Sequence, residues 1–182
     1  SKVKNMSYMF YDVSELQSRC LWPFNVQNVK DMSYMFKYML KLESLDLSNF
    51  KTINVENMNG MFENSKELTD LRINNFDTSK TTSMSTMFSG LSKLVSLNVR
   101  NFDTSKVKDM SFMFQSCTEL TSLDITNFNT EKVENMGFMF SECTNLTSID
   151  VSKFETSSVR NMWNMFGGLM SVERLDLTKF NT

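Results

Sequence analysis

Methionine pairs are the residues of this chain whose type and spacing best match metal-binding chemistry. Thioether sulfur is a soft ligand that suits Cu(I), and the spacing Met-x-x-Met brings two sulfurs close together. However, a Phe directly follows each pair, the chain contains no His, and no Cys lies beside a pair. We therefore favour packing over copper binding, and we expect no metal and no cofactor. The pairs, here called Met boxes with their Phe, begin at Met6, Met32, Met58, Met84, Met110, Met136 and Met162.

The cysteines are the second group of residues that could do chemistry, by forming a disulfide. Cys117 and Cys143 are one repeat apart, and Cys20 stands alone in an irregular part of the chain. Equivalent positions of stacked repeats lie about 5 Å apart, so a disulfide is geometrically conceivable. We favour the alternative, in which Cys117 and Cys143 are buried thiols that behave as small apolar side chains.

Enzymatic catalysis has little support. The absence of His removes the commonest general base, and the five glycines form no phosphate-binding loop. No Cys pair or acidic cluster has metal-ligand spacing. The Ser, Lys and Asp residues that a serine–lysine or paired-carboxylate mechanism needs recur with the repeat, which favours a structural or surface role. We predict that the protein is not an enzyme.

A constant period positions all of these residues. The first Met of each box recurs every 26 residues without insertion or deletion, and a period of this length is typical of a solenoid. The boxes hold 14 of the 16 methionines. A second register of seven phenylalanines follows the same period: Phe24, Phe50, Phe76, Phe102, Phe128, Phe154 and Phe180.

Each repeat offers one strand and one turn. In the clearest copy, Gln115–Phe140, Leu123 and Ile125 alternate with Ser122 and Asp124, which predicts a short, half-buried strand. The three apolar residues of a Met box are spaced i, i+3, i+4, as on one face of a single helical turn. Neither element can bury its apolar side alone, so we expect each coil to be covered by the next.

The chain as a whole is predicted to be a single array of about seven repeats, 1–182. Because it begins and ends inside a repeat, without capping sequences or a signal peptide, we expect a fragment of a longer protein. The expected divisions are 1–10 (partial), 11–36 (degenerate), 37–62, 63–88, 89–114, 115–140, 141–166 and 167–182 (partial).

Charge and hydropathy restrict the partners. The net charge is −2, from 19 basic and 21 acidic residues, and no basic cluster is visible along the sequence. We therefore expect no nucleic acid and no anionic membrane as a partner. The apolar runs are too short to span a bilayer, so we expect no direct membrane insertion.

A family resemblance rests on two segments, MFQSCTELTSLDITNFNTEKVENMGFMF and MFSECTNLTSIDVSKFETSSVRNMWNMF. They resemble the 26-residue bacterial surface protein repeat of the BspA-like leucine-rich-repeat family, with Met in place of the usual Ala in A-F-x-x-C-x-x-L-x-x-L-x-L. The resemblance covers essentially the whole chain. It implies a secreted or cell-surface protein that adheres to host matrix or serum proteins or to neighbouring bacteria.

Together these observations predict an α/β repeat solenoid. It is expected to be a leucine-rich-repeat-like, right-handed coil stack, with a parallel β-sheet on one face and short helical or 3-10 turns on the other. The repeat Tyr11–Phe36 departs from the pattern, because Arg19 stands where a core Leu belongs and Pro23 lies beside Trp22. We expect a degenerate or edge coil there, with Arg19 turned toward solvent.

The outward strand positions, here called the strand face, form the first candidate binding surface. Small strand residues and bulkier residues on the opposite wall predict that this face is concave. Arginine is enriched at interface hot spots, so Arg72, Arg100 and Arg174 are the strongest candidates. The alternative is a solvated sheet face without a binding role. The candidate protein-binding residues are Asp46, Arg72, Asn98, Arg100, Asp124, Asp150, Arg174 and Asp176.

The wall that carries the Met boxes, here called the box wall, is the second candidate surface. Its variable positions include Tyr8, Tyr34, Phe112, Phe138 and Trp163. Such aromatic residues form an interaction stripe if they face solvent, but we favour a role in padding the gaps between neighbouring turns.

Two polar registers are predicted to connect the coils. We expect Asn49, Asn75, Asn101 and Asn127 to form a ladder between coil backbones, interrupted by Lys153 and Lys179. The register Thr52, Thr78, Thr104, Thr130, Thr156 and Thr182 is expected to satisfy turn backbone groups with its hydroxyls.

Two functions follow from these features. The leading one is a non-catalytic cell-surface module that binds host or neighbouring-cell proteins in the manner of an adhesin. Arg72, Asn98 and Arg100 favour it, because they break the Ser/Asp pattern in the middle of the array. The alternative is a structural spacer or stalk with end-to-end self-association, because uncapped coil ends favour such contacts.

Overall fold

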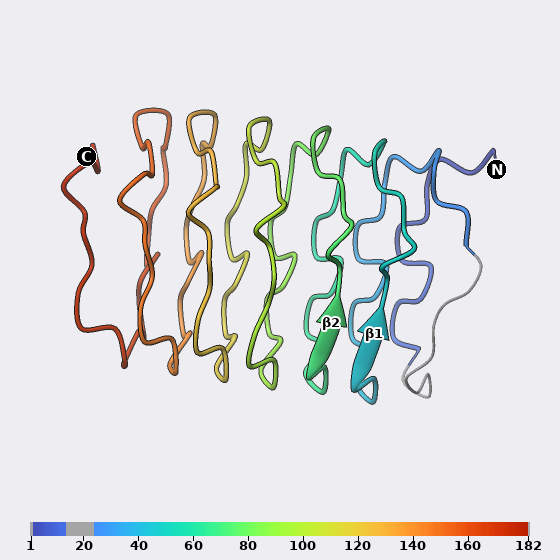
Figure 1. Cartoon of the computed structure of the whole chain (residues 1–182), viewed down its shortest axis with the longest axis horizontal. Coiled ribbons are helices and arrows are strands. Elements are labelled where there is room, and N and C mark those ends of the chain that lie inside the picture. The colour runs from blue at the N-terminus through green and yellow to red at the C-terminus, as the bar shows by residue number, and fades with distance from the viewer. Residues whose placement is uncertain (1, 14–23, 182) are drawn as a thin grey trace.

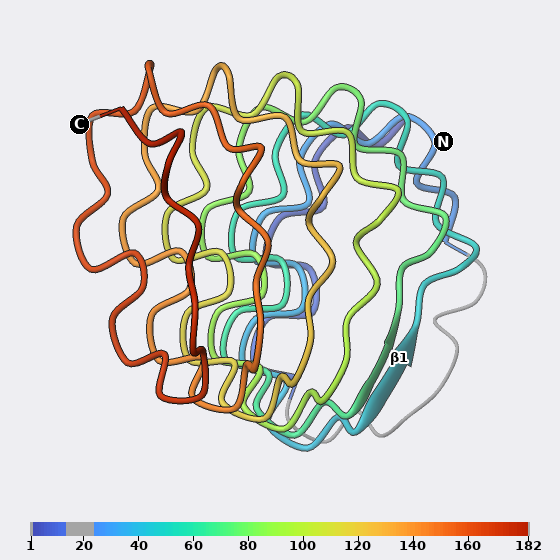
Figure 2. The same ribbon diagram turned by 60° about the vertical axis from the view of Figure 1, so that its left-hand side comes forward.

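The fold is a stack of coils, one for each repeat. A computed structural model describes residues 2–13 and 24–181, and Figure 1 shows the coils side by side from one terminus to the other. Turning the view shows that each coil is a nearly closed loop stacked on its neighbour (Figure 2). The predicted repeat fold is confirmed. Arg19, Cys20, Trp22 and Pro23, on which the predictions for the degenerate repeat depend, lie outside the described residues.

The strand face holds less regular structure than predicted. β1 (Ser44–Asp46) and β2 (Asp70–Arg72) pair in parallel, with Leu45 opposite Leu71. Elsewhere along the described part of this face, one isolated parallel bridge joins Ser96 to Ser122. A continuous parallel sheet is therefore not formed along the described part of this face. The concave shape stays a prediction.

The box wall corrects the predicted fold class. None of the described residues lies in a helix, so the predicted helical or 3-10 turns, and with them the α/β class, are wrong. Instead, parallel bridges join every pair of adjacent coils along this wall, from Asn5 with Asp31 to Asn135 with Asn161. Box residues donate their N–H groups to the next coil, as in Tyr34 N to Asn59 O at 2.8 Å.

Backbone dihedrals explain why the boxes are not helical. The third residue of each box has a positive φ, which a right-handed helix does not contain. The N–H of Met35 also donates to the carbonyl of Met32 at 3.2 Å, as in a type II turn. Turn and helix both place residues i, i+3 and i+4 inward, so the apolar pattern predicted burial but not conformation. The positive-φ residues are Tyr8, Tyr34, Gly60, Thr86, Phe112, Phe138 and Asn164.

Thr86 tests whether the third residue of a Met box has a positive φ. It is a β-branched residue at φ 55°, and the left-handed region costs a non-glycine residue about 1–2 kcal/mol. Thr86→Gly is therefore expected to raise the free energy of unfolding by about 1 kcal/mol, measured by urea denaturation. Ser85→Gly, at the neighbouring position without a positive φ, is expected to lower it. A loss of stability in both variants would contradict the assigned turn.

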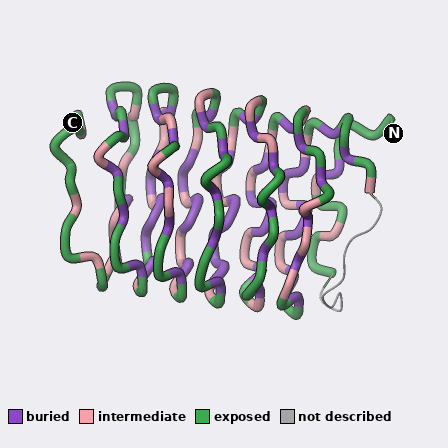
Figure 3. The backbone as a smooth tube through the Cα atoms, viewed as in Figure 1, coloured by how far each residue is buried: buried purple, intermediate pink, exposed green. Residues whose placement is uncertain are grey.

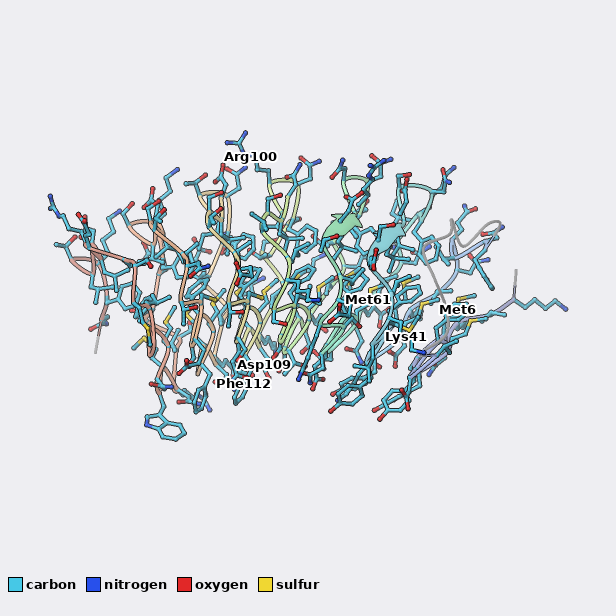
Figure 4. All side chains as sticks on the ribbon, turned by 90° about the horizontal axis from the view of Figure 1, so that it is seen from below. Met6, Lys41, Met61, Arg100, Asp109 and Phe112 are labelled. Carbon is cyan, nitrogen blue, oxygen red and sulfur yellow. The ribbon has the colours of Figure 1, made fainter. Side chains whose placement is uncertain are left out.

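The core is a continuous column between the two walls. Figure 3 shows buried segments recurring in every coil, and Figure 4 shows methionine sulfur running through the interior. The box phenylalanines stack from coil to coil, with ring centroids 5.9 Å apart for Phe36 and Phe62 and 5.7 Å apart for Phe114 and Phe140. The box methionines from Met32 to Met139 are all buried. The predicted packing role is confirmed for them, and burial leaves their sulfurs unavailable to copper.

The two described cysteines are free and buried. The Sγ of Cys117 donates to the carbonyl of Phe88 at 3.1 Å, and that of Cys143 donates to the carbonyl of Phe114 at 3.0 Å. Interaction with the Cys143 thiol and burial raise the pKa of Cys117 well above its ordinary value. The prediction of two buried thiols is confirmed, and they form no disulfide.

The polar registers connect the coils as predicted. Asn75 Nδ2 donates to the carbonyl of Ser48 at 2.9 Å, and Asn101 Nδ2 donates to that of Asn74 at 3.0 Å. Each Thr hydroxyl of its register, from Thr52 to Thr156, donates to a backbone carbonyl 25 residues further on. These bonds confirm the Asn ladder at Asn75 and Asn101 and the Thr register from Thr52 to Thr156, and they satisfy backbone groups at the coil corners. Thr182 lies outside the described residues.

Candidate functional site

The strand face presents its arginines to solvent. The side chain of Arg100 is 69% exposed and that of Arg72 is 60% exposed. In Figure 4, Arg100 projects from one face of the stack, while Phe112 and Asp109 lie on the opposite, box-wall side. The face thus offers long, charged and accessible side chains at the positions that the sequence singled out.

Both arginines already contact carboxylates. Arg72 Nη2 lies 3.1 Å from Asp70 Oδ2, and its Nη1 lies 3.9 Å from Asp46 on the preceding coil. Arg100 Nε donates to Asp124 Oδ2 on the following coil at 2.5 Å. Exposed ion pairs of this kind contribute at most about 1 kcal/mol, so a partner's carboxylate can replace either contact at little cost.

The acidic candidates have a structural role that the sequence analysis missed. The carboxylate of Asp150 accepts hydrogen bonds from the backbone N–H of Ser152 at 3.0 Å and from its hydroxyl at 2.6 Å. Asp124 and Asp176 do the same with Thr126 and Thr178. Each is an Asx turn that closes a coil corner. The recurring pattern Asp-x-Ser/Thr was the available signal.

These hydrogen bonds hold the carboxylates ionised. The Ser or Thr two residues on is the largest cause of the lowered pKa of Asp46, Asp150 and Asp176. The pKa of Asp124 is lowered to about 2, first by Thr126 and then by Arg100. Because the folded-state pKa of Asp124 lies below its ordinary value, the stabilisation from this carboxylate is present above about pH 4 and is lost as the pH falls toward about 2. The lowered pKa values of Asp46, Asp150 and Asp176 give a pH dependence of the same sign.

A titration separates the effects of Thr126 and Arg100 on the pKa of Asp124. Thr126→Val removes the hydroxyl donor, and Arg100→Ser removes the guanidinium. We expect Thr126→Val to raise the pKa of Asp124 more than Arg100→Ser does, measured from the carboxyl carbon by NMR. The reverse order would show that the ion pair, rather than the turn, controls this carboxylate.

A shallow cleft brings three of the predicted residues together. Asn98, Arg100 and Asp124 line an open hollow of about 270 Å³ on the strand face, together with Ser96 and Ser122. Asp46 and Arg72 lie on β1 and β2, outside this cleft. Asp150, Arg174 and Asp176 belong to the following coils and do not line it. The strongest candidate site is therefore the cleft with its Arg100–Asp124 pair.

The aromatic residues of the box wall mainly pack on one another. Tyr8 stacks on Tyr34 at 4.8 Å, and Phe112 stacks on Phe138 at 4.7 Å. The predicted padding role is confirmed for Tyr34, Phe112 and Phe138, which are partly buried. Trp163, packed edge-on against Phe138, is 72% exposed.

Two further findings concern the described part of the chain. Within 2–13 and 24–181, no cluster of three or more His, Cys, Asp or Glu side chains could hold a metal ion. The same residues contain no helix long and apolar enough to cross a membrane.

The stacked coils, the apolar Leu, Met and Phe columns and the parallel bridges define a leucine-rich-repeat solenoid. A leucine-rich repeat protein from Eubacterium ventriosum shares this fold, with a TM-score of 0.52, 17% sequence identity, and coverage of 82% of this chain and 43% of that one. One from Bacteroides ovatus gives a TM-score of 0.48, 19% identity, and coverage of 94% and 52%. The chain thus spans about half the length of these two proteins.

Within this class, the chain belongs to the family described as "Mycoplasma protein of unknown function, DUF285", whose profile matches residues 1–97 and 66–180. The predicted resemblance to BspA-like leucine-rich-repeat proteins is confirmed. A comparison with curated protein sequences gave no significant match.

Proposed function

We propose that this chain is a non-catalytic protein-interaction module that recognises its partners through the strand face. The observation that carries the proposal is the cleft lined by Asn98, Arg100 and Asp124, in which Asn98 and Arg100 depart from the prevailing Ser/Asp pattern of the strand face. Leucine-rich-repeat proteins commonly act as protein-interaction modules, which supports the general class of function. We further propose an adhesin-type role at the cell surface, with host or neighbouring-cell proteins as partners.

The chemistry of the cleft suits an acidic or amide-rich protein surface. Arg100 carries five N–H donors in a planar fork, which matches carboxylates and backbone carbonyls. Asn98 and Ser96 add shorter polar groups around it. Arg72 extends this basic character onto β2, where it lies between two carboxylates. A partner carboxylate can displace Asp124 or Asp70 from the arginines at little cost, because those pairs are exposed.

The test is binding of the purified chain to a panel of matrix, serum and bacterial-surface proteins by surface plasmon resonance. A variant with Arg72→Ser, Arg100→Ser and Arg174→Ser is expected to lose at least tenfold in affinity for any ligand found. The matched control, with Lys66→Ser, Lys153→Ser and Lys179→Ser, removes the same charge from other exposed positions. It is expected to change affinity less than twofold.

Two outcomes would reject the strand face as the binding surface. Equal losses in the two variants would indicate non-specific electrostatic attraction. Absence of saturable binding, together with a mass that grows with concentration in light scattering, would instead favour the spacer or self-associating stalk.

A further inference from the structure

One edge of the stack gathers basic residues that are scattered in the sequence. Two positions of each coil are involved: the first lies four residues before the first Met of the Met box, and the second lies two residues before it. Over seven coils these positions hold eight Lys or Arg and two Glu. Five of these basic residues lie in four consecutive coils and are here called the basic row. The basic row consists of Lys80, Lys106, Lys108, Lys132 and Arg160.

Backbone hydrogen bonds between adjacent coils place these residues side by side. Residues at the second of these positions donate N–H groups to their counterparts one coil earlier, as in Lys108 N to Thr82 O at 2.9 Å and Arg160 N to Glu134 O at 2.8 Å. Backbones joined in this way lie about 4.8 Å apart. The basic row therefore advances one coil at a time along the shortest path across the stack.

The side chains of the basic row point to one surface. Val107 and Val133, which lie between the two positions, are fully buried, so the flanking lysines point outward. Lys108, Lys132 and Arg160 line one shallow cleft of about 440 Å³ together with Glu131 and Glu134. Further along the same edge, Lys2, Lys4 and Lys30 line a second cleft of about 610 Å³ with Asn28 and Asn54.

The charges of the basic row are not neutralised by ion pairs. Lys37, Lys93 and Arg100 elsewhere in the array each pair with a carboxylate. By contrast, no member of the basic row forms an ion pair with another described residue. Lys80 Nζ donates to Asn54 Oδ1 at 2.6 Å, and Lys106 Nζ donates to the carbonyl of Ser79 at 2.8 Å. These neutral acceptors orient the ammonium groups and leave their charge available.

Glu131 and Glu134 line the same cleft as Lys108, Lys132 and Arg160, and neither forms an ion pair with a described member of the basic row. Further acidic residues near the row are engaged in turns. Asp77 and Asp103, on the adjacent turn, direct their carboxylates to the Ser two residues on, at 3.0 and 2.9 Å from its backbone nitrogen. Among the described residues of the second cleft, Lys30 forms an ion pair with Glu56, at 2.6 Å.

We propose that the basic row binds an extended acidic polysaccharide that carries sulfate or carboxylate groups. A row one charge wide and several coils long matches a linear polyanion better than it matches a membrane plane. No aromatic residue occupies 79–82, 105–108, 131–134 or 157–160, so the stacking platforms of single-stranded nucleic acid binding are absent from these segments. Ser, Thr and Asn side chains along the same edge are suited to sugar hydroxyls. This site is separate from the strand face.

The test is titration of the full chain with a heparin-derived oligosaccharide at several salt concentrations. A variant with Lys80→Ser, Lys106→Ser and Lys132→Ser is expected to lose at least tenfold in affinity. Its slope of log affinity against log salt should be shallower by about three, because each lost contact releases about one counterion fewer. Serine occurs naturally at this register in Ser158, so the variant is expected to fold, which its melting temperature verifies.

Control variants make each outcome informative. Lys80→Arg, Lys106→Arg and Lys132→Arg should retain binding, whereas Lys66→Ser, Lys153→Ser and Lys179→Ser should lose less than twofold. Equal losses in the two serine variants, or no oligosaccharide binding at all, would overturn the proposal. Tighter binding of oligothymidylate or of phosphatidylserine vesicles at the same salt would overturn the assignment to a polysaccharide. Protein binding through the strand face is unaffected by any of these results.

Discussion

Phe114→Ala is expected to lower the free energy of unfolding by about 3–5 kcal/mol, because a large side chain leaves a cavity in a packed column. Phe114 is completely buried, and its ring lies 5.6 Å from that of Phe88 and 5.7 Å from that of Phe140. The lost contacts therefore involve two neighbouring coils. In a solenoid each coil contacts only its neighbours, so the adjoining coils have few other contacts to compensate.

Chemical denaturation of Phe114→Ala beside Val95→Ala measures this effect. Val95 is about half exposed, and its truncation is expected to change stability by no more than about 0.5 kcal/mol. A loss below about 1 kcal/mol for Phe114→Ala would show that the aromatic column is not a main source of stability.

Thr104→Val is expected to lower the free energy of unfolding by about 2–4 kcal/mol, although valine has nearly the same shape. The hydroxyl of Thr104 donates to the carbonyl of Asn129 at 2.9 Å and accepts from the N–H of the same residue at 2.8 Å. Since Thr104 is buried, water cannot easily replace the hydroxyl. Valine would leave two backbone groups of Asn129 without partners.

Thr104→Ser is the matched control. It keeps the hydroxyl and removes one methyl group, so its loss of stability is expected to be about 1 kcal/mol. If Thr104→Ser were as destabilising as Thr104→Val, the methyl group rather than the hydrogen bonds would stabilise the corner.

The period alone predicted the features that depend on repetition. The Phe and Met columns, the Asn ladder and the Thr register follow from the stacking of identical positions, and stacking requires no knowledge of local conformation. The period also predicted that Cys117 and Cys143 are buried thiols, because other coils have Met39 and Leu91 at their register.

Local conformation was the harder part. The spacing of Met136, Met139 and Phe140 fits a helical turn and a type II turn equally well. The deciding feature, a positive φ at Phe138, is adopted by an aromatic residue that rarely favours it. The N–H of Phe138 donates to the carbonyl of Trp163 in the next coil. The apolar spacing within a single repeat carries no information about that partner.

The candidate sites show the same limit. Asn98 and Arg100 were identified because they depart from the Ser/Asp pattern, and Asp124 because it occupies an outward strand position, but the Asx turn formed by Asp124 and Thr126 was missed. The basic row was missed because its members are 26 residues apart along the chain and never form a basic run. In an array, charge must be counted along each register as well as along the sequence.

The most direct test of the proposed function is hydrogen–deuterium exchange of the chain with and without a bound protein from the panel. We expect protection of amides in 96–100 and 122–126, with no change in the Met boxes. Unchanged exchange in these two segments, with protection confined to the box wall, would contradict recognition through the strand face.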